Sequence, residues 1–255
     1  MKILCIGNSF AVDVSTYVHQ IAQSADKDID IYVLYIGGCS ITRHYKNILS
    51  GEKEYEFYKN GSRTPLMWCS IHEGIAYEKW DYITFQQVST DSCDADTFFP
   101  ELPLLMEEVR KLSNGQFLLH KTWSYSKRHS HEKYGKNPMN QEKMSEDIEK
   151  AYNIVSSKIN VPFIIPSGTA ITNARKVFGD ELDRDGYHLN ERGRTVTGYL
   201  WAYYFLGSDI DVSGFRPSGH SYDDIIPPVN EKELPVLMEI AKKTLEENKG
   251  HNLNG

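Results

Sequence analysis

The sequence predicts an α/β fold in which a parallel β-sheet lies between helices on both of its faces. Short apolar segments that are typical of buried strands alternate with segments of helical periodicity along the chain. Strands that are joined by helices run parallel, and the helices then cover both faces of the sheet. The 255 residues suit one large α/β domain that spans residues 1–255, and they are few for two domains.

Five segments are predicted to form the strands of the parallel sheet. The first is an apolar run that ends in glycine, and the second is rich in β-branched and aromatic residues and ends at the breaker pair Gly37-Gly38. In chain order, the five segments are residues 2–7, 29–36, 80–87, 116–122 and 161–165.

Helices are predicted between these strands and after the last one. Asn140 is placed to cap one of them, and Pro100 and Pro103 interrupt another near its start. The expected helices are residues 12–24, 97–113, 139–158, 168–177, 194–206 and 231–248. The polar segment 124–138 is expected to be a loop, either over the site or solvated on the surface.

A β-hairpin insertion is predicted near residues 54–70. The segments 54–59 and 63–69 flank Asn60-Gly61, which is the strongest short hairpin signal because both residues adopt positive φ readily. We expect this hairpin to decorate the fold and not to supply a core strand of the parallel sheet.

The composition argues against several classes of partner. The net charge is −7 and the pI about 5.7, whereas nucleic acids and anionic membrane surfaces attract basic patches. No segment approaches the ~20 apolar residues of a membrane span. The chain has neither a GxxxxGK[ST] nor a GxGxxG motif, so we expect no nucleotide cofactor. The oligomeric state stays open.

The cysteines and histidines indicate neither a metal site nor an oxidising compartment. The four cysteines form no CxxC pair and no metal-type spacing. His129 and His131 lie in a polar loop, where solvated side chains are the more ordinary interpretation. The start of the chain has no apolar signal segment, which favours the cytoplasm, although a chain whose signal peptide had been removed would look the same.

Ser9 is the candidate nucleophile. It follows the first predicted strand within Gly7-Asn8-Ser9-Phe10, and ligands of open α/β sheets bind outside the carboxyl ends of the strands. The alternative is that Ser9 only caps a helix.

His188 and Asp185 are the candidate base and its orienter. They lie in Asp185-Gly186-Tyr187-His188, before a predicted helix, and one short turn can deliver both side chains to one place. An imidazole must take the proton of a serine hydroxyl, and a carboxylate fixes the tautomer of that imidazole. Asp183 is a competing orienter, and a surface histidine beside a solvated aspartate is the alternative.

These two segments together resemble the SGNH (GDSL-type) hydrolase superfamily. Ser9 matches its first sequence block, a glycine of Gly37-Gly38 its second, and Asp185 with His188 its last. The resemblance extends from the first strand to the helix near residue 206. It implies a flavodoxin-like, three-layer α/β/α sandwich with a five-stranded parallel sheet, a Ser-His-Asp triad and no cofactor. It also implies an oxyanion hole with the backbone N–H groups of Ser9 and Gly38.

The chain departs from the superfamily in its third block. The usual Gly-x-Asn-Asp is absent, and Gln86-Gln87 stands close to the position of the missing asparagine. A glutamine carries the same amide on a longer stem, so Gln87 or Gln86 is expected to complete the oxyanion hole, with Gln87 preferred. This departure indicates a divergent branch.

Further residues are expected to contact the substrate. Trp123, Tyr125 and Ser167 follow the fourth and fifth predicted strands, where they either line a pocket or serve packing and capping. Asn8 and Tyr187, which adjoin Ser9 and His188, are the other two candidates.

The combined features predict a serine esterase. The resemblance implies a small-molecule or glycan ester as substrate, with O-acetyl groups on carbohydrates first. The alternatives are a non-catalytic carbohydrate-binding or scaffold domain, which the missing asparagine favours, and a phosphodiester or thioester hydrolase on the same triad.

Overall fold

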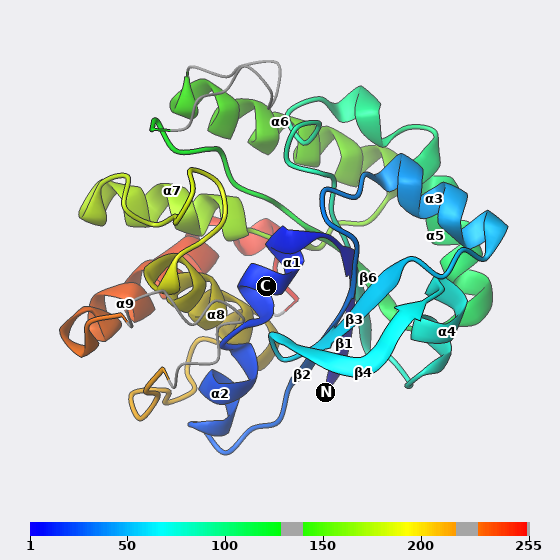
Figure 1. The fold of residues 1–255 in the computed structure, drawn as a ribbon. Coiled ribbons are helices and arrows are strands. Elements are labelled where there is room, and N and C mark those ends of the chain that lie inside the picture. Colours follow the sequence, from blue (N-terminus) through cyan, green and yellow to red (C-terminus); the bar gives the residue numbers. More distant parts are fainter. Residues whose placement is uncertain (129–139, 218–228, 254–255) are drawn as a thin grey trace.

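A mixed, seven-stranded β-sheet forms the centre of the protein in a computed structural model that describes residues 1–128, 140–217 and 229–253 (Figure 1). The strand order is β4-β3-β2-β1-β5-β6-β7. The parallel strands are β1 (Lys2–Gly7), β2 (Asp30–Tyr35), β5 (Tyr82–Phe85), β6 (Gln116–His120) and β7 (Ile164–Ile165). The predicted strands are therefore all present, in some cases shorter than expected.

The strand β1 holds the middle of the sheet. It pairs with β2 on one side and with β5 on the other, as in Ile3↔Ile31 and Cys5↔Thr84. Ile3 and Cys5 are at most 1% exposed, because helices cover both faces. Burial on both sides explains why this strand reads as a continuous apolar run.

The hairpin extends the sheet, which therefore has seven strands and is mixed, whereas a five-stranded parallel sheet with a hairpin insertion was expected. Its strands are β3 (Tyr55–Lys59) and β4 (Ser62–Cys69), joined by Asn60-Gly61, where φ is 51° and 77°. The strand β3 pairs antiparallel with β2. The physical reason is the free edge of β2, whose N–H and C=O groups need partners.

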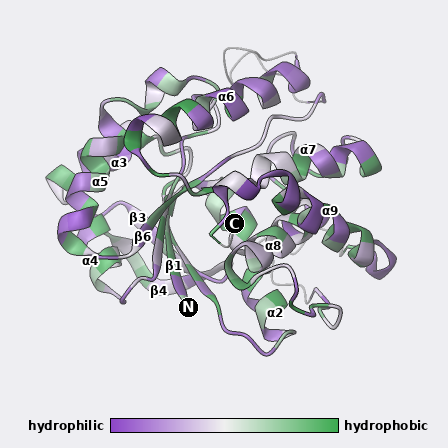
Figure 2. Ribbon diagram, turned by 180° about the vertical axis from the view of Figure 1, so that it is seen from behind, coloured by the Kyte–Doolittle hydropathy of each residue, from purple (hydrophilic) through white to green (hydrophobic). Residues whose placement is uncertain are grey.

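The helices form two layers, one on each face of the sheet, and the ribbon in Figure 1 shows them on opposite sides of the strands. The first layer contains α1 (Ser9–Ser15), α2 (Val18–Gln23), α7 (Ser167–Phe178), α8 (Glu191–Leu206) and α9 (Leu234–Glu247). The second contains α3 (Ile41–Ser50), α4 (Ile71–Ala76), α5 (Glu101–Leu112) and α6 (Gln141–Ile159). Figure 2 shows apolar strands in the middle and hydrophilic stretches along the outer helices.

Three helical segments differ from the prediction. The single helix expected over residues 12–24 is broken after Ser15, where the hydroxyls of Ser15 and Thr16 both donate to the carbonyl of Val12. The helices α3 and α4 were not predicted. A capping box of Ser70 and Glu73 begins α4, and this pattern is readable in the sequence.

No helix in residues 1–128, 140–217 and 229–253 combines the length and the apolar character that a membrane span requires.

The predicted site residues lie together at the end of the sheet where the parallel strands have their carboxyl ends. Ser9 follows β1, Gly38 follows β2, Gln87 follows β5, Trp123 follows β6 and Ser167 follows β7. Parallel pairing of these strands therefore brings segments from the whole chain to one place.

Gly168, at the start of α7, allows the closest approach between this helix and the chain after β6. A Cβ atom at Gly168 would lie 2.0 Å from the carbonyl oxygen of Thr122. We expect Gly168→Ala to lower the free energy of unfolding by about 2–3 kcal/mol, because backbone must move to admit the methyl group. Urea denaturation measures the loss. Gly250→Ala is the matched control, since a Cβ there meets no atom within 4 Å. Equal midpoints for both variants would contradict this packing argument.

Candidate active site

Ser9 is the first residue of α1, and only Asn8 separates it from the end of β1. Asn8 caps this helix, and its Oδ1 accepts a hydrogen bond of 3.1 Å from the N–H of Phe10. The capping role therefore belongs to Asn8 and not to Ser9. Because Ser9 is half-buried while Asn8 and Phe10 are buried, its hydroxyl stays accessible at the edge of the sheet.

The structure brings Ser9, His188 and Asp185 into one hydrogen-bonded line. Ser9 Oγ lies 2.9 Å from His188 Nε2, and His188 Nδ1 lies 2.6 Å from Asp185 Oδ2. A carboxylate only accepts hydrogen bonds, so Nδ1 carries the proton and Nε2 is left to accept from the serine. This is the arrangement in which an imidazole can remove a proton from a hydroxyl.

The competing orienter, Asp183, does not contact the imidazole in this arrangement. Its Oδ1 accepts from the N–H of Gly186 at 2.7 Å and pairs with Arg128 at 3.4 Å. Burial raises the pKa of the Asp183 carboxyl, although the Gly186 N–H opposes the shift. Asp183 therefore shapes the turn that carries Asp185 and His188.

The Asp185 carboxylate is stabilised in its charged form. Partial burial by itself raises its pKa, but hydrogen bonds from the His188 ring and from the N–H groups of Tyr187 and His188 outweigh burial and lower the pKa to about 2. Asp185 is thus ionised across the neutral pH range and can orient the imidazole.

The loop that carries His188 is tied down on both sides. Asp183 and Leu189 form an isolated antiparallel bridge at its base. The segment after β6 holds its tip, because the Ser126 N–H donates to Gly186 O at 2.7 Å and Trp123 Nε1 donates to Tyr187 O at 2.7 Å. These contacts give the imidazole a defined position although it lies in a loop.

The turn after β2 places Gly38 near the nucleophile. Gly38 is exposed and has a φ of +60°, which favours glycine. The next residue, Cys39, accepts a hydrogen bond of 3.2 Å from Asn8 Nδ2 through its carbonyl oxygen. Asn8 therefore links the residue before Ser9 with the residue after Gly38.

The third-block glutamines make contacts that were not predicted. Gln86 Nε2 donates to Asn8 Oδ1 at 2.8 Å, and Gln86 Oε1 lies 2.7 Å from His120 Nδ1. Gln87 Nε2 donates to Thr97 O at 2.8 Å. Both amides thus have partners inside the protein, and the preferred assignment of Gln87 to the oxyanion hole does not match its direction.

Among the five expected substrate contacts, only Tyr187 is both partly exposed and beside the imidazole, at 4.1 Å between ring centres. The other four, Asn8, Trp123, Tyr125 and Ser167, are at most 2% exposed.

The ring of Trp123 stacks on Phe10 at 4.0 Å. Ser167 accepts from Trp201, and the Tyr125 hydroxyl donates to Ser89. These buried residues serve packing and positioning, which was the alternative interpretation for three of them.

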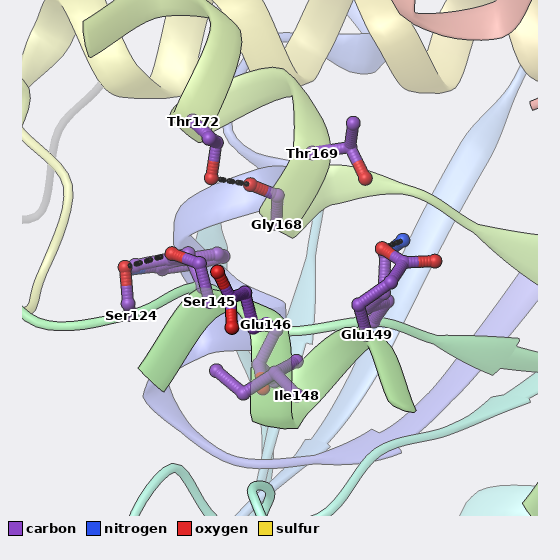
Figure 3. Close-up of a pocket in the computed structure, with 11 residues that line it drawn as sticks. Ser124, Ser145, Glu146, Ile148, Glu149, Gly168, Thr169 and Thr172 are labelled. Atoms are coloured by element: carbon purple, nitrogen blue, oxygen red, sulfur yellow. Dashed lines mark hydrogen bonds and ion pairs between the residues drawn. The ribbon is translucent and has the colours of Figure 1, made fainter. Parts of the chain in front are cut away.

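A cavity of about 220 Å³ lies between α6, α7 and the chain after β6. Figure 3 shows Ser145 and Glu149 from α6 facing Gly168 and Thr172 from α7. Trp123 lines this cavity, whereas none of Ser9, His188 and Asp185 does. The expected pocket role of Trp123 thus concerns a neighbouring space.

The described residues contain one group of side chains that could hold a metal ion, namely His19, Asp28 and Asp30. Asp30 is the first residue of β2, so this group lies at the amino end of the parallel strands, whereas Ser9 lies at their carboxyl end. Asp30 also pairs with Lys59 at 2.8 Å. His129 and His131, and residues 129–138 of the predicted loop, lie outside the described residues.

Residues 2–224 match the family model described as Domain of unknown function (DUF4886). The chain belongs to the DUF4886 family. A crystal structure of a DUF4886 family protein from Bacteroides uniformis is 32% identical, with a TM-score of 0.82 over 100% of this chain and 98% of that chain. The search of curated protein sequences found no match.

The fold of this DUF4886 chain is shared with SGNH hydrolases. A candidate SGNH hydrolase from Slackia heliotrinireducens has a TM-score of 0.53 at 20% identity, over 79% of this chain and 97% of that chain. A lipase/acylhydrolase from Enterococcus faecalis has a TM-score of 0.51 at 12% identity, over 85% and 99%. The predicted resemblance to SGNH hydrolases is thereby confirmed for the fold.

The low pKa of Asp185 predicts a pH-dependent contribution to stability. A carboxyl whose pKa falls from 3.8 to about 2 on folding stabilises the protein above its unfolded pKa, and this contribution is lost as the pH falls through about 2. The shift corresponds to about 2 kcal/mol, which solvent reduces to about 1 kcal/mol because the side chain is 41% exposed.

We therefore expect the stability difference between wild type and Asp185→Asn to be about 1 kcal/mol larger near pH 5 than near pH 2. Urea denaturation at both pH values measures it. A difference that does not change with pH would show that the Asp185–His188 hydrogen bond gives the carboxylate no advantage.

Proposed function

We propose that the protein is a cofactor-independent serine ester hydrolase in which Ser9 is the nucleophile, His188 the general base and Asp185 its orienter. The observation that carries the proposal is the 2.9 Å contact between Ser9 Oγ and His188 Nε2, with the opposite ring nitrogen 2.6 Å from Asp185. The three side chains come from both ends of the chain, so local sequence alone does not account for their meeting.

The proposed reaction has two steps. Ser9 Oγ attacks the ester carbonyl while His188 Nε2 takes its proton, and the tetrahedral intermediate collapses as the imidazolium returns that proton to the departing alcohol. Water then attacks the acyl-serine with His188 again as base, which releases the acid and restores Ser9. Asp185 stabilises the imidazolium in both steps.

We assign the oxyanion hole to the backbone N–H groups of Ser9 and Gly38. Asn8 supports this assignment, because it binds the carbonyl of Cys39 and is itself held by Gln86. In this proposal Gln86 acts through Asn8 to hold two backbone donors, in place of a side-chain amide that would touch the oxyanion. Rigid donors of this kind cost no reorganisation when charge develops.

The proposed substrate is an ester with a short acyl group, most simply an acetyl group, on a carbohydrate or another small molecule. Tyr187, half-buried beside His188, offers an aromatic surface at the reacting centre, and such surfaces suit sugar rings.

Ser9→Ala tests the nucleophile. We expect a fluorophosphonate to add once to the wild type, by intact-mass spectrometry, and not to the variant, because the imidazole then has no hydroxyl to activate. We also expect hydrolysis of p-nitrophenyl acetate to fall by at least about 10³-fold.

Ser89→Ala is the matched control, since Ser89 lies in the loop after β5 and its hydroxyl bonds to Tyr125 instead of an imidazole. Turnover retained in Ser9→Ala would overturn the proposal, and an unlabelled wild type would favour a non-catalytic binding domain.

The acyl preference is tested separately with p-nitrophenyl esters of two to eight carbons, together with acetylated sugars. We expect kcat/KM to be highest for acetyl esters. A maximum at the longest chain, or turnover confined to thioesters or phosphodiesters, would overturn the substrate assignment while leaving the roles of Ser9 and His188 in place.

A further inference from the structure

Asp13 connects the helix of Ser9 directly to the loop of His188. It lies on α1, one turn after Ser9, and its side chain is completely buried. Its Oδ2 accepts a hydrogen bond of 2.8 Å from the N–H of Leu189, the residue that follows His188. A single side chain thus joins the two segments, which are 179 residues apart where Ser9 and His188 meet.

Two arginines complete this connection. Asp13 Oδ1 accepts from Arg194 Nε at 3.0 Å and Nη2 at 2.9 Å, and from Arg184 Nη1 at 3.0 Å. Arg184 also donates to the carbonyl oxygen of Leu189. The N–H and the C=O of the residue next to His188 are therefore both held, one by Asp13 and the other by a partner of Asp13.

Among the described residues, two carboxylates and two guanidinium groups make up this buried group, and their opposite charges are paired. Arg194, also completely buried, donates to Glu191 Oε1 at 3.0 Å, and the Tyr17 hydroxyl donates to Oε2 of the same carboxylate. In the described part of the chain, Asp13 pairs with both arginines and Glu191 pairs with Arg194. Paired, hydrogen-bonded charges avoid the desolvation penalty of a lone buried ion, but removal of one member leaves the others uncompensated.

We propose that Asp13 is a positioning residue for the reaction, because it sets the location of His188 relative to Ser9. This inference rests on the proposed function. Asp13 does not touch the reacting atoms, and it acts through the backbone of Leu189. A displacement of about 1 Å between nucleophile and base can cost about 100-fold in rate, so a rigid link of this kind affects catalysis directly.

Asp13→Asn is the informative variant, because it preserves size while replacing one acceptor oxygen by a donor amide. That amide must face either the Leu189 N–H or the guanidinium groups, and each of these is a donor. Glu191→Gln is the matched control. It disturbs the same buried group and the same Arg194, but Glu191 makes no hydrogen bond to Leu189 in the described part of the chain.

Two measurements separate the inference from the proposed function. The ¹⁵N NMR shifts of the His188 ring, assigned by their loss in His188→Gln, report its hydrogen bonds without any turnover. We expect Asp13→Asn to move these shifts and Glu191→Gln to leave them in place. The rate of fluorophosphonate labelling, per folded molecule, should fall about 10–100-fold in Asp13→Asn and less than about threefold in Glu191→Gln.

Unchanged His188 shifts in a folded Asp13→Asn would overturn the inference, whether or not the wild type is labelled. Equal effects of both variants on the shifts would also overturn it, because the role would then be structural only. If Asp13→Asn does not fold, an amide-to-ester replacement at Leu189 removes the N–H that Asp13 binds, and the same replacement at Arg184 is its control, because it removes the N–H that the His188 carbonyl accepts. Moved His188 shifts in the Leu189 ester support the inference, and unmoved shifts overturn it. Absence of labelling in the wild type counts against the proposed function alone.

Discussion

The hydrogen bonds of the buried Asp13 carboxylate join the segments that carry the candidate site. One of its oxygens accepts hydrogen bonds from Arg194 on α8, and the other accepts from the Leu189 N–H in the loop of His188. The helix that bears this carboxylate also bears Ser9. A buried ion group has few alternative geometries, because any rearrangement leaves a charge without a partner in a medium of low dielectric constant. The connection that Asp13 makes between the helix of Ser9 and the loop of His188 therefore lies in the core.

A second buried chain of hydrogen bonds supports the opposite side of the site. It runs from His120 through Gln86 to Asn8 and ends at the carbonyl of Cys39. Burial lowers the pKa of His120 to about 3, so this histidine is neutral and takes part as a hydrogen-bonding group only. Gln86, which directly follows β5, thus holds the side chain of Asn8, and the amide of Asn8 in turn binds the carbonyl of Cys39.

Much of the fold was predictable, because strand and helix periodicity are local properties. The five parallel strands and the Asn60-Gly61 hairpin were found where the apolar runs and the turn residues predicted them. The docking of the hairpin onto β2 was not predicted, since the free edge of a strand does not show in its sequence. The break after Ser15 was not predicted either, because the apolar residues keep their helical spacing across it. The helix ends where the hydroxyls of Ser15 and Thr16 bind the carbonyl of Val12.

The sequence by itself determined which chemical groups are available: a serine after the first strand, and an aspartate three residues before a histidine near the last helices. Only the tertiary structure decided which groups meet, namely that Asp185 and not Asp183 binds His188, and that Gln87 turns toward Thr97. Helices and strands can be predicted from the spacing of apolar residues along the chain. Side-chain direction and long-range partners depend on how distant segments pack, and Asp13, an ordinary acidic residue in the sequence, acquires its partners only there.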